Sequence, residues 1–159
     1  MSYLKVNYIC TISLSLILFI LIISQAKSQI IKIVDGDTIH LNGEKIRFTG
    51  IDTPELKQTC IKEGVINPCG VIAKEILIEK ISDNKVECSS EGKDRYKRTL
   101  ADCFVNGESL STYLVRSGYA FAYRRYSKKY IPDEDYAKAN QIGMWNMKFQ
   151  YPWDYRRKN

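Results

Sequence analysis

The stretch IVDGDTIHLNGEKIRFTGIDTPE, residues 33–55, places two strand-like runs on either side of Asn42-Gly43. An Asn-Gly pair between such runs is typical of a two-residue β-turn in which both residues have positive φ. Because a turn of this kind fixes the register of the two strands, it also fixes which residues meet at the open end of the hairpin. Asp37 precedes the first run and Asp52 follows the second. We therefore expect their carboxylates at one end of the hairpin.

The remaining patterns indicate an α+β domain. Three later segments have the β-branched and aromatic residues of strands: 84–90, 99–105 and 118–123. Three segments have the apolar spacing or the boundary residues of helices: 71–81, 108–117 and 133–145. Five short strands with this spacing suit a small closed β-barrel, which leaves few free strand edges. The sequence therefore predicts a five-stranded barrel with about three helices.

The N-terminal segment is typical of a secretory leader. Lys5 precedes an apolar run over residues 9–23, and Ser24-Gln25-Ala26 follows that run. A positive start, a short apolar segment and small residues at the exit characterise a signal peptide. The run is shorter than the ~20 residues that a membrane-spanning helix usually needs. We expect residues 1–26 to be removed, which leaves one domain over 27–159 in a secreted or periplasmic protein. An uncleaved leader would instead anchor the protein in a membrane.

Four cysteines lie in the predicted mature chain: Cys60, Cys69, Cys88 and Cys103. An exported protein with an even number of cysteines usually forms disulfides, and four cysteines allow three pairings. Cys60 and Cys69 bracket a short loop, whereas Cys88 and Cys103 lie in two strand-like runs. We therefore predict the disulfides Cys60–Cys69 and Cys88–Cys103. A zinc site is disfavoured, because there is no CxxC pair and His40 is the single histidine.

The acidic residues of 33–55 are suitable ligands for a hard divalent cation. Oxygen ligands without histidine or cysteine favour Ca²⁺ or Mg²⁺ over zinc. The same residues have a simpler interpretation, because Asp-Gly-Asp-Thr is a good turn and Asp-Thr-Pro can cap a loop. Arg47 lies inside an apolar strand, where a charge needs a partner. It could pair with a nearby aspartate, or it could hold a phosphate through two N–H groups. Arg98, taken alone, is a surface charge.

The charge balance favours a polyanionic partner without requiring one. Residues 27–159 contain 23 basic and 18 acidic side chains, a net charge of +5. Residues 123–130, YRRYSKKY, alternate rings with cations, which suits the bases and phosphates of a single strand. A solvated basic loop is the alternative. The final YPWDYRRKN, residues 151–159, is expected to pack its rings on the domain and leave its charges in solvent.

In combination, these motifs resemble the staphylococcal nuclease family, and the leader suggests an exported bacterial member. The resemblance rests on VDGDT at 34–38, R-x4-DTPE at 47–55 and DRYKR-x-LA at 94–101. It continues through LVRSGYA at 114–120 to GMW at 143–145. The family fold is a five-stranded OB-type barrel with three helices, which agrees with the elements expected above. The four cysteines and the segment 60–69 depart from the best-known member of the family.

The resemblance implies a Ca²⁺ site, with Mg²⁺ the less favoured metal. Asp37 and Asp52 would bind Ca²⁺ through their carboxylates, and Thr53 would bind it through its backbone carbonyl. Asp35 would support the site from behind these ligands.

The resemblance also implies a catalytic set for phosphodiester hydrolysis. Glu55 would orient or deprotonate the attacking water. Arg47 and Arg98 would hold the phosphate and stabilise the charge that builds up on the five-coordinate phosphorus.

The residues that grip the substrate follow less directly from the resemblance. Arg95 and Tyr96 would lie near a terminal phosphate, and Tyr123 and Tyr126 are the nearest candidates for base-stacking rings. The implied protein is a monomeric, secreted nuclease of DNA and RNA that favours single strands, leaves 3′-phosphates and needs no protein partner. A nucleic-acid-binding module that has kept the barrel and lost catalysis is the alternative.

Overall fold

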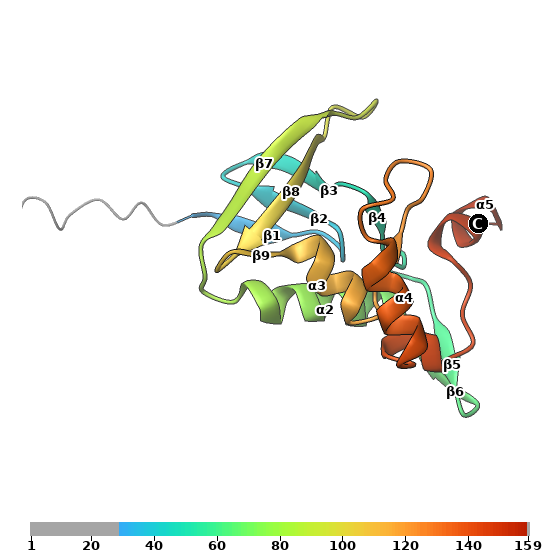
Figure 1. The fold of residues 1–159 in the computed structure, drawn as a ribbon. Coiled ribbons are helices and arrows are strands. Elements are labelled where there is room, and N and C mark those ends of the chain that lie inside the picture. Colours follow the sequence, from blue (N-terminus) through green and yellow to red (C-terminus); the bar gives the residue numbers. More distant parts are fainter. Residues whose placement is uncertain (1–28, 159) are drawn as a thin grey trace, which may run out of the picture.

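The computed structural model describes residues 29–158, so the predicted leader over 1–26 lies outside the described part of the chain. Six strands form the main sheet: β1 (Ile31–Ile33), β2 (Thr38–Leu41), β3 (Glu44–Phe48), β7 (Val86–Lys93), β8 (Thr99–Val105) and β9 (Glu108–Ser109). Their order is β1-β2-β3-β8-β7, with β9 paired to β8 (Figure 1). Two short pairs accompany this sheet: β4 (Ile51–Asp52) with β10 (Phe121–Ala122), and β5 (Cys60–Lys62) with β6 (Val65–Asn67).

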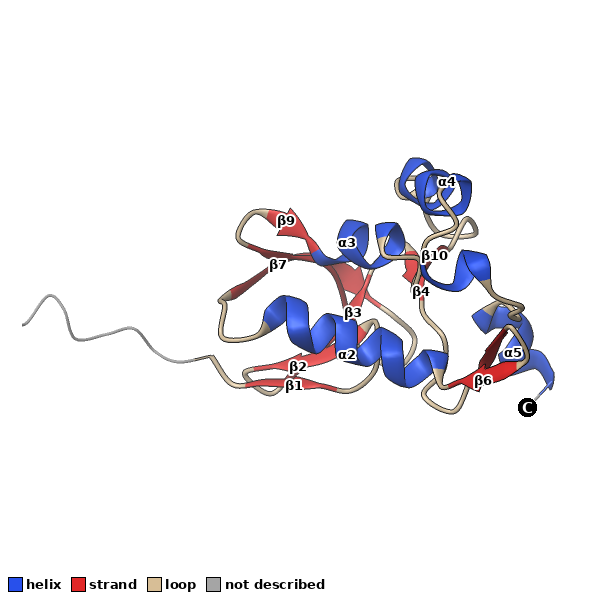
Figure 2. Ribbon diagram, turned by 90° about the horizontal axis from the view of Figure 1, so that it is seen from below, coloured by secondary structure: helices blue, strands red, loops and turns tan. Residues whose placement is uncertain are grey.

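Helices cover one side of the main sheet and extend beyond one end of it. Within residues 29–158 they are α2 (Cys69–Ile81), α3 (Leu110–Arg116), α4 (Ile131–Ala139), the 3₁₀-helix η1 (Gly143–Asn146) and α5 (Pro152–Lys158). Figure 1 and Figure 2 both show α2 and α3 beside the sheet, with α4 and α5 on the side of β4. No helix in the described part of the chain is both long and apolar enough to cross a bilayer.

The α+β class is confirmed, and so is the hairpin predicted from Asn42-Gly43. Both turn residues have positive φ, 51° and 89°, and Thr38 pairs with Arg47 across β2 and β3. The prediction of a closed barrel was wrong. Over residues 29–158, β1 and β7 are the two ends of the sheet and do not pair with each other. The side chain of Gln29 joins them instead, since its amide donates to the carbonyl and accepts from the N–H of Val86, each at 2.8 Å.

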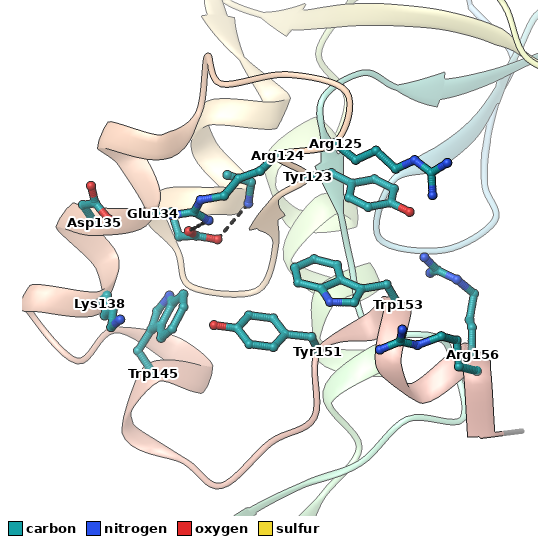
Figure 3. A pocket seen from close by; sticks show the side chains of 12 residues that line it. Tyr123, Arg124, Arg125, Glu134, Asp135, Lys138, Trp145, Tyr151, Trp153 and Arg156 are labelled. Carbon is teal, nitrogen blue, oxygen red and sulfur yellow. Dashed lines mark hydrogen bonds and ion pairs between the residues drawn. The ribbon is translucent and has the colours of Figure 1, made fainter.

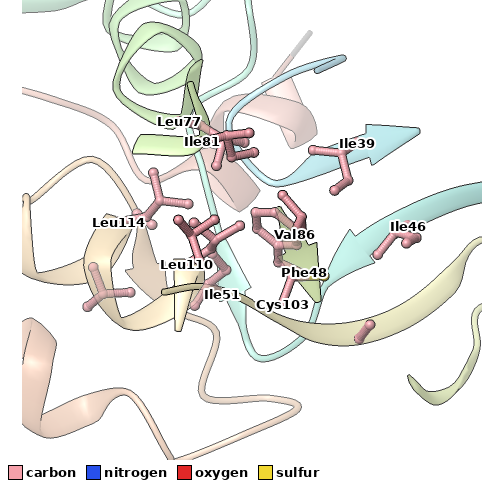
Figure 4. Close-up of a cluster of buried hydrophobic side chains, with 14 of the residues drawn as sticks. Ile39, Ile46, Phe48, Ile51, Leu77, Ile81, Val86, Cys103, Leu110 and Leu114 are labelled. Atoms are coloured by element: carbon pink, nitrogen blue, oxygen red, sulfur yellow. The ribbon is translucent and has the colours of Figure 1, made fainter. Parts of the chain in front are cut away.

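The three predicted helices are present, but the segment 133–145 is divided into α4 and η1, and α5 is a further helix that was not predicted. In α2, Ala73, Leu77 and Ile81 are buried at a spacing of four residues. The Ser109 hydroxyl accepts a hydrogen bond from the N–H of Thr112 and so caps α3. These helices close a core formed with the sheet by Ile39, Ile46, Phe48, Ile51, Leu77, Val86, Leu110 and Leu114 (Figure 4).

Both predicted disulfides are present. Cys88 and Cys103 are directly opposite each other on β7 and β8. Cys60 at the start of β5 is joined to Cys69 at the start of α2. The segment between them was expected to be a loop and is instead a hairpin, whose turn residues Glu63 and Gly64 both have positive φ.

The C-terminal segment is tied to this hairpin. Ile61 and Lys148 exchange two backbone hydrogen bonds of 2.9 and 2.8 Å. The side chain of Gln58 donates to the carbonyl of Gln150 at 2.6 Å. These contacts direct the chain after residue 147 back across the domain, so that α5 lies close to the end of the β2–β3 hairpin.

Candidate active site

The loop between β1 and β2 directs the Asp37 carboxylate into the protein. The N–H of Asp37 donates to the carboxylate of Asp35 at 3.0 Å, and one Asp37 oxygen accepts from the N–H of Thr53 at 3.1 Å. Gly36 permits this approach, because a Cβ there would lie 2.9 Å from the Thr53 hydroxyl oxygen. Asp35, Asp37 and Thr53 are therefore adjacent, and their roles at a metal site stay predictions.

Arg47 joins the two buried aspartates. One of its terminal nitrogens lies 2.5 Å from an Asp37 oxygen, and the other lies 2.8 Å from an Asp52 oxygen. The aspartate side chains are only 2% and 0% exposed, whereas that of Arg47 is 18% exposed. One guanidinium spans both contacts, so the two carboxylate oxygens face the same small volume. The hairpin register brings this about by pairing Thr38, next to Asp37, with Arg47.

Burial raises the pKa of Asp37 to about 7, and the neighbouring charges of Asp35 and Asp52 act in the same direction. The guanidinium of Arg47 offsets part of this effect. The pKa of Arg47 is raised in turn, since the two aspartates outweigh the effect of its own burial. The cluster thus concentrates negative charge in a volume that excludes water, which is an arrangement that favours a cation.

Glu55 lies at the rim of this cluster and has a side chain that is 42% exposed. Its N–H donates to the side chain of Gln58 at 3.2 Å, and its carbonyl accepts from the N–H of Gln58 at 2.7 Å. Gly70, in the first turn of α2, packs directly on this backbone. A Cβ at Gly70 would come within 1.8 Å of the Glu55 carbonyl oxygen. The backbone of Glu55 is therefore held in place while its carboxylate stays accessible.

Arg156 on α5 completes the cluster, and the sequence analysis missed it. One terminal nitrogen lies 2.7 Å from a Glu55 oxygen and 3.1 Å from one Asp52 oxygen, and the other lies 2.7 Å from the second Asp52 oxygen. The expectation that all charges of residues 151–159 stay in solvent was wrong for this residue. The contact joins positions 104 residues apart, and no local pattern in the sequence indicates it.

The basic turn between β7 and β8 forms a separate group. The Arg98 guanidinium donates to the Asp94 carboxylate at 2.8 and 2.7 Å and lies 5.6 Å from the centre of the Tyr96 ring. Arg95 lies over the same ring at 4.7 Å. Over residues 29–158, Arg98 makes no ion pair with Asp37, Asp52 or Glu55. Its catalytic role, and the substrate roles of Arg95 and Tyr96, stay predictions.

A groove of about 760 Å³ adjoins the cluster and is called here the aromatic groove. Arg156 belongs to its lining, so the groove and the carboxylates share one side chain. The ring of Trp153 is nearly parallel to the rings of Tyr123 and Tyr151, at centroid distances of 5.6 and 4.6 Å (Figure 3). Tyr126 packs edge-on against Tyr123, at 4.9 Å, and is 70% exposed. The lining consists of Ala122, Tyr123, Arg124, Arg125, Glu134, Asp135, Lys138, Trp145, Tyr151, Trp153, Arg156 and Arg157.

Comparison with known proteins identifies the family. Residues 45–147, more than half of the chain, match the model of the staphylococcal nuclease homologues. The chain belongs to the staphylococcal nuclease family. This range includes Arg47, Asp52, Glu55 and Arg98. It ends before α5, so Arg156 lies beyond the matched region.

Relatives in the family include proteins with nuclease names. The chain is 32% identical to an uncharacterised endonuclease of Haemophilus influenzae over 74% of its own length and 65% of that protein's. It is 29% identical to endonuclease YncB of Bacillus subtilis, over 71% of its own length and 58% of the relative's. It is also 29% identical to the thermonuclease of Staphylococcus intermedius, over 76% of its own length and 77% of the relative's. The chain thus spans less than two thirds of the Haemophilus and Bacillus proteins.

The donor set fits a hard cation of the kind that the family resemblance implies. Asp37 and Asp52 present carboxylate oxygens to one volume, and the acidic side chains beside them, Asp35 and Glu55, also offer oxygen. Over residues 29–158 there is no group of three or more His, Cys, Asp or Glu side chains that could hold a metal by themselves. The two aspartates would therefore need oxygen from the backbone, such as the Thr53 carbonyl, and from water.

Proposed function

We propose that this protein is a Ca²⁺-dependent nuclease that hydrolyses phosphodiester bonds in DNA and RNA. The observation that carries the proposal is the pair of buried aspartates that share one guanidinium, with the accessible carboxylate of Glu55 beside them. Membership of the staphylococcal nuclease family and the nuclease names of several relatives support it.

The proposed chemistry assigns one task to each side chain. Asp37, Asp52 and the Thr53 carbonyl would hold Ca²⁺, and Asp35 would fix the loop that carries Asp37. Ca²⁺ would supply positive charge close to the scissile phosphate. Mg²⁺ requires nearly ideal octahedral geometry and tends to keep several coordinated water molecules. It is therefore the less favoured metal for a site with two protein carboxylates.

The remaining residues would act on the phosphate and on the water. Glu55 would accept a proton from the water that attacks phosphorus, since its carboxylate is accessible and its backbone is fixed. As the new P–O bond forms, the bond to the 5′-oxygen would break and leave a 3′-phosphate. Arg47 and Arg98 would stabilise the charge on the phosphoryl oxygens, for which a planar guanidinium with several donors is suited.

Single strands are the proposed preferred substrate. Tyr123 and Tyr126 offer rings on which bases can stack, and Arg95 and Tyr96 would contact phosphate on the other side of the site. The protein is proposed to act as a monomer, without a protein partner. Its domain would span residues 27–159 after export and removal of residues 1–26. N-terminal sequencing of the exported protein should give Lys27 as the first residue, whereas Met1 would indicate a membrane anchor.

The activity is tested by digestion of single-stranded DNA and RNA with the mature protein, in Ca²⁺, in Mg²⁺ and in a chelator. Cleavage in Ca²⁺ that is lost in the chelator and in Asp52→Asn would support the proposal. Equal cleavage with and without chelator would contradict it. Binding of the oligonucleotide without cleavage in Ca²⁺ would favour the alternative, a nucleic-acid-binding module of the same fold.

A further inference from the structure

Asp52 has no free carboxylate oxygen. One oxygen accepts from Arg47 at 2.8 Å and from Arg156 at 3.1 Å, and the other accepts from Arg156 at 2.7 Å. The side chain is fully buried beneath these two guanidinium groups. A cation that binds Asp52 therefore competes with these two guanidinium groups for its oxygens. A divalent charge placed next to both would also be strongly repelled, since the surroundings are poorly hydrated.

Of the two arginines that contact Asp52, Arg156 is the one whose side chain can move away. Arg47 is fixed by its position inside β3, by its second contact to Asp37 and by its burial, with a side chain that is 18% exposed. Arg156 lies on the last helix and has a side chain that is 38% exposed. Its departure uncovers the second oxygen of Asp52 and the carboxylate of Glu55 together.

Contacts other than those of Arg156 hold α5 on the domain, so the helix can stay docked when the Arg156 side chain leaves Asp52. Trp153 on α5 packs parallel to Tyr123 and Tyr151, and Tyr151 packs on Phe121 at 5.2 Å. The released guanidinium thus remains beside the aromatic groove, whose lining it already joins. There it is exposed and unpaired, so its planar donors are available to an anion such as a phosphate.

We propose that Arg156 exchanges partners during the reaction cycle. It neutralises Asp52 and Glu55 before the metal binds, and it binds a phosphate of the nucleic acid once the metal has taken its place. The inference rests on the proposed nuclease function and assigns a competing and substrate-positioning role to a residue outside the family match. It predicts that one substitution changes the affinities for metal and for substrate in opposite directions.

The first measurement is Ca²⁺ affinity without nucleic acid, by isothermal titration calorimetry on the wild type and Arg156→Gln. Loss of the competing guanidinium should tighten Ca²⁺ binding about fivefold to tenfold. The matched control is Arg157→Gln, which removes the same charge from the same helix but from a side chain that pairs with Asp154 and is 77% exposed. The control should leave Ca²⁺ affinity close to that of the wild type.

The second measurement is binding of a fully phosphorothioate-linked deoxythymidine decamer in saturating Ca²⁺, by fluorescence anisotropy. Arg156→Gln should weaken this binding about fivefold or more, and by a larger factor than Arg157→Gln. Thermal unfolding of both variants checks that α5 stays docked, because a helix that detaches would lower the melting temperature.

Each outcome decides between the hypotheses. Tighter Ca²⁺ binding with weaker decamer binding in Arg156→Gln supports the exchange. Ca²⁺ affinity that is unchanged or weaker in Arg156→Gln overturns it while leaving the proposed nuclease intact, and so does unchanged decamer binding. Failure of the wild type and both variants to bind Ca²⁺ would overturn the metal-dependent nuclease and the exchange together.

Discussion

At the scale of single residues, the cluster is defined by how little solvent reaches its aspartates. Asp37 and Asp52 are buried, and both are paired with Arg47, while Asp52 is paired with Arg156 as well. Their proximity was predictable, because one two-residue turn sets the register that brings Asp37 next to Arg47. The position of Arg156 was not predictable, since its contacts to Asp52 and Glu55 depend on how the whole C-terminal segment packs.

The raised pKa of Asp37 predicts a pH-dependent stability of the metal-free protein. The pKa is about 7 in the fold and 3.8 in a model side chain, so folding favours the protonated carboxyl. The stability that Asp37 contributes is therefore complete below about pH 4 and is lost as the pH rises through 7. Asp37→Asn cannot titrate and should become more stable than the wild type, by an increasing margin, between pH 4 and 8.

Chemical denaturation in a chelator at several pH values measures this margin. A margin that stays constant over the whole range would contradict the raised pKa. Asp35→Asn is a useful comparison, because removal of the neighbouring charge should lower the pKa of Asp37 and shift the loss of stability to lower pH.

Arg98 provides the second prediction at this scale. Arg98→Ala should lower kcat by about 10² to 10³, the usual cost of one preorganised donor to a charged transition state. Ca²⁺ affinity should not change, because Arg98 pairs with Asp94 and not with the buried aspartates. The measurements are initial rates on single-stranded DNA and calorimetric Ca²⁺ titration. Retention of most activity would remove Arg98 from the catalytic set.

At the scale of elements, the sequence predicted the helices and the hairpin that local residue patterns determine. It did not predict correctly how strands that are distant in the sequence pair with one another. Helix α2 follows from its apolar spacing, α3 follows from its Ser109 cap, and α4 has the expected Pro132 in its first turn. The barrel was expected to close, but β1 has only three residues and its edge is joined to β7 through Gln29. The segment 60–69 formed a hairpin because Glu63-Gly64 adopts a positive-φ turn, a weaker signal than Asn42-Gly43.

The contact between α2 and the backbone of Glu55 gives a prediction for an element. Gly70→Ala places a methyl group where only 1.8 Å separates it from the Glu55 carbonyl oxygen, so the first turn of α2 must move. We expect a loss of about 1–3 kcal/mol in stability and a lower kcat, since Glu55 is displaced. Urea denaturation and initial rates measure the two effects.

The control for this change is Gly64→Ala at the tip of the β5–β6 hairpin. That residue has positive φ, so a substitution is strained there as well, but a Cβ would meet nothing within 4 Å. It should cost stability without lowering kcat. A normal kcat in Gly70→Ala would mean that α2 does not position Glu55.

At the scale of the whole molecule, the C-terminal segment after residue 147 covers the site through Arg156. The family match ends at residue 147, and the chain beyond it contributes Tyr151, Trp153 and Arg156 to the aromatic groove. Backbone bonds between Ile61 and Lys148 tie this segment to the hairpin that the Cys60–Cys69 disulfide closes. The sequence resemblance was enough to identify the family, whereas the contact of the C-terminal segment with the site became evident only from the structure.

The central claim is that Asp37 and Asp52 form the cation site of a nuclease. A crystal structure of the exported protein grown with Ca²⁺ and the phosphorothioate decamer tests it most directly, with anomalous scattering to locate the metal. We predict a Ca²⁺ ion within about 2.3–2.6 Å of oxygens from both aspartates, and Arg156 moved from Asp52 to a backbone phosphate. Anomalous density elsewhere, with the ion pairs of Asp52 to Arg47 and Arg156 intact in crystals that contain Ca²⁺ and the decamer, would contradict the claim.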